Sequence, residues 1–153
     1  MKAGIIGATG YGGLELLRFL HNHEEVEEIG LFTSSDEGTL FSDKFPHLTD
    51  IYNQPLLKLD DDALAEYDVV FASTPSGVSS TIFPSLVERG PKLIDLSGDF
   101  RLKNLASYEN WYKKNPAPQE VVDRSVYGLT EWNESAIEKA DLIANPGCYP
   151  TAV

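Results

Sequence analysis

The feature that most constrains the fold is a glycine-rich turn between two apolar segments at the start of the chain. Residues 2–6 form a short apolar run suited to a buried strand, and residues 29–33 form a second. After the turn at 7–13, leucines recur near helical spacing between residues 14 and 20. A strand, a glycine turn, a helix and a second strand make up a βαβ unit, which is the building block of parallel α/β sheets.

The turn itself has the spacing G-x-x-G-x-x-G, a variant of the dinucleotide-binding fingerprint. Glycine lets the backbone approach a pyrophosphate closely, and the following helix offers its free N–H groups to the phosphate charge. A tight turn without a ligand is the alternative. The predicted cofactor-binding residues of this turn are Gly7, Thr9, Gly10, Tyr11, Gly12 and Gly13.

The rest of the chain continues the alternation of strands and helices. Strands are expected at 68–73, 92–97 and 141–144, and helices at 60–66, 78–89, 107–114 and 134–139, whereas residues 34–60 read as irregular. Continuous apolar strands suit a sheet that is covered on both faces. We therefore expect an α/β, Rossmann-like, mostly parallel open sheet with helices on both faces, forming one NAD(P)-binding domain over residues 1–153.

Composition excludes several classes of partner. The chain has 24 acidic and 12 basic residues and a formal net charge of −12, which argues against nucleic acid and against anionic membranes. The apolar runs are far shorter than the roughly 20 residues that span a bilayer. A secretory signal is not evident, and a single cysteine forms no internal disulfide, so a cytoplasmic location is expected. The three histidines lack metal-site spacing with that cysteine, and no metal is expected.

Two more turns follow predicted strands at the edge where such sheets bind ligands. The hydroxyls of Ser34 and Ser35 suit a 2′-phosphate, whereas Asp36 suits a ribose 2′-hydroxyl; a polar loop that touches nothing is the alternative. Thr74, Pro75 and Ser76 would line the nicotinamide side, and Ser76 is also a candidate helix cap.

Residues 96–101 follow another predicted strand and carry the basic side chain of Arg101. Its planar guanidinium suits a phosphate, and Asp99 is a candidate to hold the guanidinium in place. Ser97 and Arg101 are candidate substrate contacts. A surface ion pair is the alternative explanation for Arg101.

Cys148 lies between the predicted strand at 141–144 and a predicted helix start at Pro150. The turn that precedes it, Asn145-Pro146-Gly147, would place the thiol near free helix N–H groups, which favour the thiolate. Burial as ordinary packing is the alternative. A cysteine beside a nicotinamide cofactor can reduce an acyl group in two steps, through a thioester. Cys148 is the candidate nucleophile, and Asn145 is a candidate substrate contact.

With these motifs in order, the chain resembles the N-acetyl-gamma-glutamyl-phosphate reductases. The matching stretches are GATGYGG at 7–13, TSS at 33–35, PHL at 46–48, DVVFASTPSGVS at 68–79, DLSGDFRL at 95–102, YGLTEW at 127–132 and ANPGCYPTA at 144–152. The resemblance implies NADPH-dependent reduction of N-acetyl-glutamyl 5-phosphate to the semialdehyde, with Cys148 as nucleophile and Arg101 at the substrate phosphate.

The resemblance also has departures. Asp36 and Glu37 stand where the family carries a basic residue, so NAD remains the alternative to NADP. Family members are considerably longer, with a second domain that supplies a catalytic histidine and an interface between subunits. We therefore expect an N-terminal portion of a homo-oligomeric enzyme that is inactive alone. The competing interpretations are an aspartate-semialdehyde-dehydrogenase-like enzyme, against which the sequence around Cys148 argues, and a non-catalytic nucleotide sensor.

Overall fold

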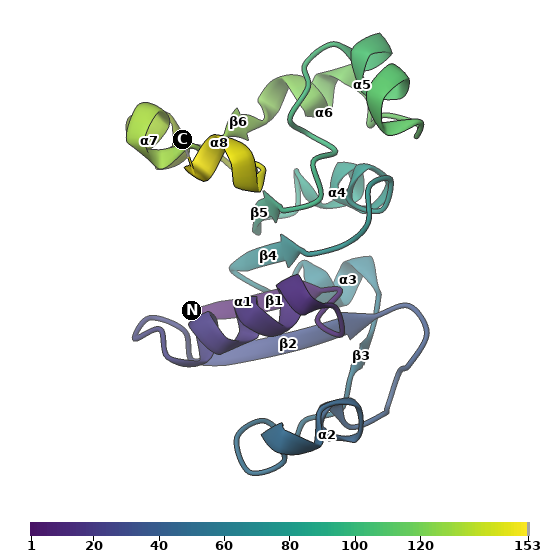
Figure 1. Ribbon diagram of the computed structural model, residues 1–153, viewed down its shortest axis with the longest axis vertical. Helices are drawn as coiled ribbons and strands as arrows, with labels where there is room; N and C mark the ends of the chain where they lie inside the picture. The colour runs from purple at the N-terminus through teal and green to yellow at the C-terminus, as the bar shows by residue number, and fades with distance from the viewer. Residues whose placement is uncertain (153) are drawn as a thin grey trace.

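A computed structural model describes residues 1–152 and contains a seven-stranded sheet in which every strand pair is parallel. The strands lie in the order β3-β2-β1-β4-β5-β7-β6 (Figure 1). Their bounds are β1 Lys2–Ile6, β2 Glu28–Thr33, β3 Leu57–Lys58, β4 Val69–Ala72, β5 Lys92–Asp95, β6 Val126–Tyr127 and β7 Leu142–Ala144. The predicted fold class is confirmed.

Helices connect most of these strands. They are α1 Tyr11–His21, α2 Phe41–Lys44, the 3-10 helix η1 Pro46–Leu48, α3 Asp61–Leu64, α4 Ser79–Leu86, α5 Leu105–Tyr112, α6 Gln119–Arg124, α7 Thr130–Ile137 and α8 Cys148–Ala152. The segment predicted as irregular contains α2, η1 and β3, and α6 and β6 were not predicted. Helix α7 begins four residues earlier than expected and contains a non-helical residue, Asn133.

The core has two layers, one on each face of the sheet. Alternate residues of β1 divide between them: Ile5 packs with Leu17 of α1, whereas Ile6 packs with Phe83 of α4. Because successive side chains of a strand point to opposite faces, this division requires apolar cover on both sides. Figure 1 shows α1 on the near side of the sheet and α3 on the far side.

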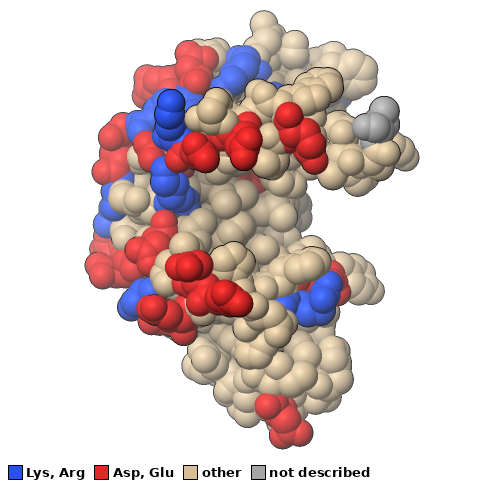
Figure 2. All heavy atoms as spheres, turned by 90° about the vertical axis from the view of Figure 1, so that its left-hand side faces the viewer, with Lys and Arg blue, Asp and Glu red and all other residues tan. Residues whose placement is uncertain are grey.

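Part of the α1 face lacks a helix over it. Phe71, Ile94 and Ile143 lie side by side in register on β4, β5 and β7, and each is only partly buried. In the space-filling view, a hollow opens between an upper and a lower lobe and its floor is largely uncharged (Figure 2). The sheet therefore presents an apolar strip that the helices of the described residues leave partly exposed.

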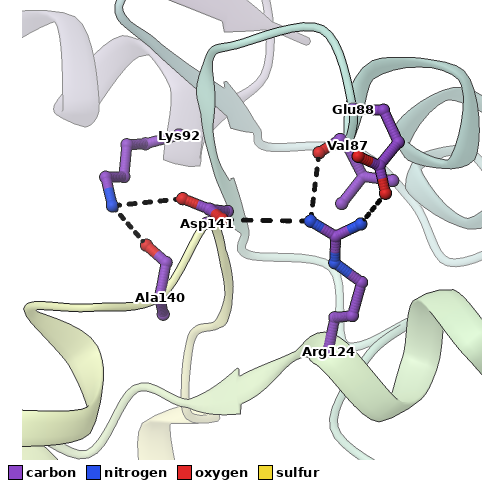
Figure 3. A network of polar contacts seen from close by, with 6 residues as sticks. All are labelled: Val87, Glu88, Lys92, Arg124, Ala140 and Asp141. Carbon is purple, nitrogen blue, oxygen red and sulfur yellow. Dashed lines mark hydrogen bonds and ion pairs between the residues drawn. The ribbon is translucent and has the colours of Figure 1, made fainter.

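At the edge of the sheet where the strands begin, a network of ion pairs on the surface connects β5, α6 and the segment before β7 (Figure 3). Lys92 at the start of β5 donates to Asp141 before β7, over 3.3 Å. Arg124 at the end of α6 contacts both Asp141, at 3.8 Å, and Glu88. All four side chains are more than one-third exposed, so each pair contributes at most about 1 kcal/mol.

Candidate active site

The strand order reverses between β1 and β4, which is where a ligand crevice is expected. From β1, the next strands in the chain are added toward one side of the sheet, as β2 and then β3. From β4 they are added toward the other side, beginning with β5, so the order reverses at the β1/β4 pair. In open parallel sheets, ligands bind beyond the carboxyl ends of the strands at this reversal. The glycine turn follows β1 and the turn at 73–77 follows β4, so both lie at that position.

The glycine turn packs against both neighbours more closely than a larger residue would allow. Gly7 has a φ of +83°, and a Cβ there would lie 2.3 Å from the carbonyl oxygen of Ser73. A Cβ on Gly13 would lie 2.4 Å from the carbonyl oxygen of Gly7. Both positions therefore require glycine. The result is that α1 starts directly against the end of β1.

The start of α1 is suited to an anion. Its N-cap is Gly10, which has no side chain to accept from the first N–H groups, and its first turn carries no acidic residue. The free N–H groups and the positive end of the helix dipole favour a negative charge at this point. The side chain of Tyr11 is 93 % exposed and is free to contact a ligand laid across the turn.

A pocket of about 200 Å³ opens beside this turn. Its wall includes six of the predicted cofactor residues, namely Gly7, Thr9, Ser34, Ser35, Thr74 and Pro75. The predicted residues Gly10, Tyr11, Gly12 and Gly13 lie on the adjoining turn and helix start, and Ser76 does not line the pocket. The volume holds part of a dinucleotide, since whole-ligand pockets run to about 300 Å³ and more.

Thr74 supports a polar ligand in this pocket. Its Oγ1 is the one buried side-chain oxygen or nitrogen that has no hydrogen-bond partner within residues 1–152. Buried polar atoms are nearly always paired, because an unpaired one costs about 1–3 kcal/mol. A ligand hydroxyl, amide or phosphate in the pocket would supply the missing partner, so the wall fits a dinucleotide.

The loop after β2 is more ordered than a free polar loop. The hydroxyl of Ser35 donates to Asp36 Oδ2 over 2.8 Å, and Lys44 of α2 donates to Asp36 Oδ1 over 2.9 Å. These hydrogen bonds, that from Lys44 first, lower the pKa of Asp36 below its usual value of 3.8. Asp36 does not line the pocket, whereas Thr33, Ser34 and Ser35 do. Sequence reading missed Lys44, because only the fold brings α2 to this loop.

Arg101 lies at the carboxyl ends of β5 and β7, as predicted, but Asp99 does not hold it. Its Nε donates to the carbonyl oxygen of Asn145 over 2.7 Å, and its Nη2 to that of Leu96 over 3.1 Å. Its Nη1 lies 3.3 Å from where a Cβ on Gly147 would stand. The guanidinium is therefore fixed by two backbone carbonyls beside the turn that leads to Cys148, and Arg101 makes no ion pair within the described chain.

Asp99 instead fixes the start of α4. Its carboxylate, 1 % exposed, accepts from the N–H groups of Gly77 and Ser80 over 2.8–3.0 Å, and from the hydroxyl of Tyr108 over 2.7 Å. The prediction that Ser76 caps this helix is wrong: the N-cap is Val78, with no side-chain cap bond. The carboxylate of Asp99, which is distant in sequence, accepts instead from the Ser80 N–H in the first turn of α4 and from the Gly77 N–H just before the helix.

A second buried carboxylate, that of Asp95, shapes the turn toward Arg101. It accepts from the backbone N–H groups of Ser97 and Gly98 over 3.0 Å each and from the Ser97 hydroxyl over 2.6 Å. Ser97 Oγ and Ser79 Oγ are 2.8 Å apart. Ser97, a predicted substrate contact, is therefore part of an internal network that anchors the loop carrying Arg101.

Cys148 is the first residue of α8 and is exposed to solvent. The predicted order of strand, turn and helix start is confirmed, and burial as ordinary packing is wrong. Asn145 joins the two strand ends: its N–H donates to the carbonyl of Asp95 over 2.8 Å, while its own carbonyl accepts from Arg101. Its side-chain amide donates to the carbonyl of Pro146 over 3.1 Å. Arg101 and Asn145 are thus in contact at adjacent strand ends, and Cys148 begins the helix three residues after Asn145.

Within residues 1–152, no group of three or more histidine, cysteine, aspartate or glutamate side chains is placed to hold a metal ion. None of the helices described above combines the length and apolar character needed to cross a membrane.

Two relatives show what the chain is similar to in sequence. The chain is 54 % identical over 153 residues to the N-acetyl-gamma-glutamyl-phosphate reductase of Geobacillus sp. (strain WCH70), matching 99 % of this chain and 44 % of the relative. It is 51 % identical over 154 residues to that of Bacillus subtilis (strain 168), matching 45 % of that protein. The resemblance drawn from the motifs is confirmed, and the chain spans less than half the length of these relatives.

Solved structures of similar fold include aspartate semialdehyde dehydrogenases. That of Vibrio cholerae, type II, covers 98 % of this chain and 42 % of its own, with a TM-score of 0.66 at 20 % identity, which establishes the fold alone. That of Candida albicans, solved with NADP, covers 65 % of this chain and 30 % of its own, with a TM-score of 0.57 at 27 % identity. Residues 2–140 match the family described as semialdehyde dehydrogenase, NAD binding domain, and the chain belongs to that family.

Proposed function

We propose that this chain is the cofactor-binding portion of an enzyme that reduces N-acetyl-glutamyl 5-phosphate to N-acetyl-glutamate 5-semialdehyde and phosphate, with NADPH as the reductant. The observation that carries the proposal is the hydrogen bond from Arg101 to the Asn145 carbonyl, three residues before Cys148, at the same sheet edge as the glycine turn. A nucleophile, an anion-binding guanidinium and a dinucleotide crevice are the parts that an acyl-phosphate reductase needs.

The cofactor would be held by the residues around the 200 Å³ pocket. The free N–H groups at the start of α1 would bind its pyrophosphate, Ser34 and Ser35 its adenosine ribose, and Thr74 would give its buried hydroxyl a partner. When bound, a reduced nicotinamide supplies a hydride to an acyl carbon. The residues that line the pocket keep the dinucleotide at the sheet edge that also carries Cys148.

Cys148 would open the reaction by attacking the acyl carbon as a thiolate. A sulfur–carbon bond forms, the bond between that carbon and the phosphate oxygen breaks, and phosphate leaves with the electron pair. Arg101 would meet the leaving phosphate, because two backbone carbonyls occupy Nε and Nη2 and leave Nη1 unengaged between the Gly98 and Gly147 turns. Ser97 positions Arg101 through its hydrogen bond to Asp95, which anchors the loop that carries Arg101. Asn145 positions Arg101 through its backbone carbonyl.

The remainder of such an enzyme would complete this domain. The partly exposed row of Phe71, Ile94 and Ile143 is unusual for a parallel sheet, in which both faces are normally covered. We infer that further polypeptide covers this strip and supplies the rest of the substrate site, in a cytoplasmic homo-oligomer. The 153-residue chain alone is then expected to bind the cofactor weakly and not to turn over.

The test is the reverse reaction in the complete gene product that contains these residues, with N-acetyl-glutamate semialdehyde, phosphate and NADP as substrates. Cys148→Ser should abolish NADP reduction, because an alcohol is a far weaker nucleophile than a thiolate. Arg101→Lys should raise the KM for phosphate more than it lowers kcat, because lysine lacks the planar fork. Full activity in Cys148→Ser would refute the mechanism.

Two controls separate the competing interpretations. Aspartate semialdehyde replaces the acetylated substrate in a parallel assay, and a preference for it would favour an aspartate-semialdehyde-dehydrogenase-like enzyme. Alkylation of Cys148 by iodoacetamide should slow when an acyl-phosphate analogue is present, because the analogue covers the exposed thiol. An alkylation rate that the analogue leaves unchanged, together with normal nucleotide binding, would favour a non-catalytic sensor.

A further inference from the structure

Lys44 lies next to the loop that is expected to read the adenosine ribose. Its Nζ donates to Asp36 Oδ1 over 2.9 Å, and the other carboxylate oxygen accepts from Ser35 Oγ over 2.8 Å. Ser35 in turn lines the pocket beside the glycine turn. The ammonium group of Lys44 is therefore two hydrogen bonds away from the pocket wall, and its charge cancels that of Asp36.

The position of Lys44 is set by core packing. Phe41, three residues earlier in α2, is fully buried, and its ring packs against those of Phe45 and Tyr52. The backbone N–H of Phe41 also donates to the carbonyl of Gln54 over 2.9 Å. Because α2 is fixed in this way, Lys44 is delivered to Asp36 by the fold, although both side chains remain about one-third exposed, at 34 % and 32 %.

The loop lacks the carboxylate that reads the 2′-hydroxyl of NAD. In NAD-binding domains of this fold, that acidic residue stands about 20 residues beyond the glycine turn, at the end of the second strand. In this chain the end of β2 is Thr33, whose hydroxyl accepts from the N–H of Ser35 over 3.3 Å. Asp36 is three residues further along, does not line the pocket, and has both carboxylate oxygens engaged.

We propose that Lys44 is the residue that makes this domain select NADPH over NADH. It holds Asp36 away from the ribose, offsets the negative charge of that carboxylate, and offers its remaining N–H donors to a 2′-phosphate beside the Ser34 and Ser35 hydroxyls. An ammonium group has three donors, so Lys44 can retain Asp36 while it binds a phosphate oxygen. This inference rests on the proposed dinucleotide binding and adds the residue that decides which dinucleotide is bound.

The experiment measures dissociation constants for NADPH and NADH by fluorescence titration of the complete gene product. Lys44→Met should weaken NADPH binding by about tenfold or more, the range of one hydrogen bond to a charged group. It should not weaken NADH binding, because the released Asp36 can accept from the ribose 2′-hydroxyl. Asp36→Asn should tighten NADPH binding, because Lys44 is then released to the phosphate. Lys139→Met is the matched control: it removes the same charge at an exposed position before β7, at the opposite edge of the sheet, and should change neither constant.

A second readout does not depend on affinity. The 2′-phosphate of bound NADP is followed by ³¹P NMR against pH; its second pKa, about 6 when free, should be lower in the wild-type complex than in Lys44→Met. Equal weakening of NADPH and NADH by Lys44→Met, or an identical phosphate titration, would overturn the role of Lys44 and leave dinucleotide binding standing. Failure of the wild type to bind either nucleotide would overturn the proposed function as well.

Discussion

Gly13→Ala is the sharpest test of how the glycine turn is built. An added Cβ would lie 2.4 Å from the carbonyl oxygen of Gly7 and 2.6 Å from the Cα of Ala8. Both neighbours are backbone atoms at the end of β1, so no side-chain rotation relieves the overlap. Helix α1 would have to retreat until these atoms reach the 3.4 Å at which ordinary contact begins, a displacement of about 1 Å.

The expected cost follows from two opposing effects. Overpacking against backbone costs roughly 1–3 kcal/mol, and two such contacts place this site at the upper end of that range. Alanine gains about 1 kcal/mol over glycine within a helix. We therefore expect Gly13→Ala to lose about 2 kcal/mol of unfolding free energy. Because the retreat of α1 also moves its N–H groups, dinucleotide affinity should fall.

Gly12→Ala is the matched control on the same helix. Its Cβ would meet only the hydroxyl oxygen of Ser73, at 2.7 Å, and that side chain can rotate away. This variant receives the same helix-propensity gain and should be neutral or stabilised by up to about 1 kcal/mol. Urea unfolding of both variants, followed by circular dichroism, measures the difference. If Gly13→Ala proves as stable as Gly12→Ala, the close packing of α1 on β1 is not as described.

The buried polar groups give two more predictions. Asp99→Asn places an amide NH₂ against the N–H of Gly77 and the hydroxyl of Tyr108, and should lower the unfolding free energy by about 3 kcal/mol in urea unfolding. The exposed control Asp141→Asn should lower it by under about 1 kcal/mol. Equal losses in the two variants would contradict the hydrogen bonds assigned to Asp99. Burial raises the pKa of Tyr52 and Tyr108 above their usual 10, so on raising the pH the unfolded chain loses these protons before the folded protein does. The contribution of the two tyrosines to the unfolding free energy is therefore fully present below pH 10 and declines above it. The fall should reach up to about 1.4 kcal/mol per pH unit for each tyrosine, and a urea midpoint that stays constant between about pH 9 and pH 11 would contradict it.

The central strands could be predicted because each is a continuous apolar run buried on two faces. Strands β1, β2, β4, β5 and β7 all lie where the sequence placed them, within a few residues. The edge strands β3 and β6 have two residues each, and they exist through hydrogen bonds to β2 and β7 rather than through a pattern of their own. Sequence periodicity carries no signal for strands of that length.

The candidate site was predictable in location but not in its side-chain partners. Parallel strands end at one edge, so the turns that follow β1, β4, β5 and β7 had to meet. Which side chains pair across that edge depends on loop geometry: Gly98, with a φ of +111°, reverses the chain between Asp95 and Asp99. Asp99 consequently reaches the start of α4, 22 residues away in sequence at Gly77, and Arg101 reaches Asn145, 44 residues away.

The net charge of −12 is compatible with two anionic ligands because of where the charges lie. The acidic segment at 24–28 ends at the first residue of β2, and the ribose-facing loop begins after the last, Thr33. Six extended residues span roughly 17–20 Å, about twice the Debye length of 8 Å at physiological ionic strength. Over that distance the acidic segment is screened, whereas the proposed donors Lys44, Arg101 and the α1 N–H groups would act on a bound phosphate in direct contact. The sign of the potential that a phosphate meets is thus set by these few donors, so removing one of them should matter more for binding than removing several distant carboxylates.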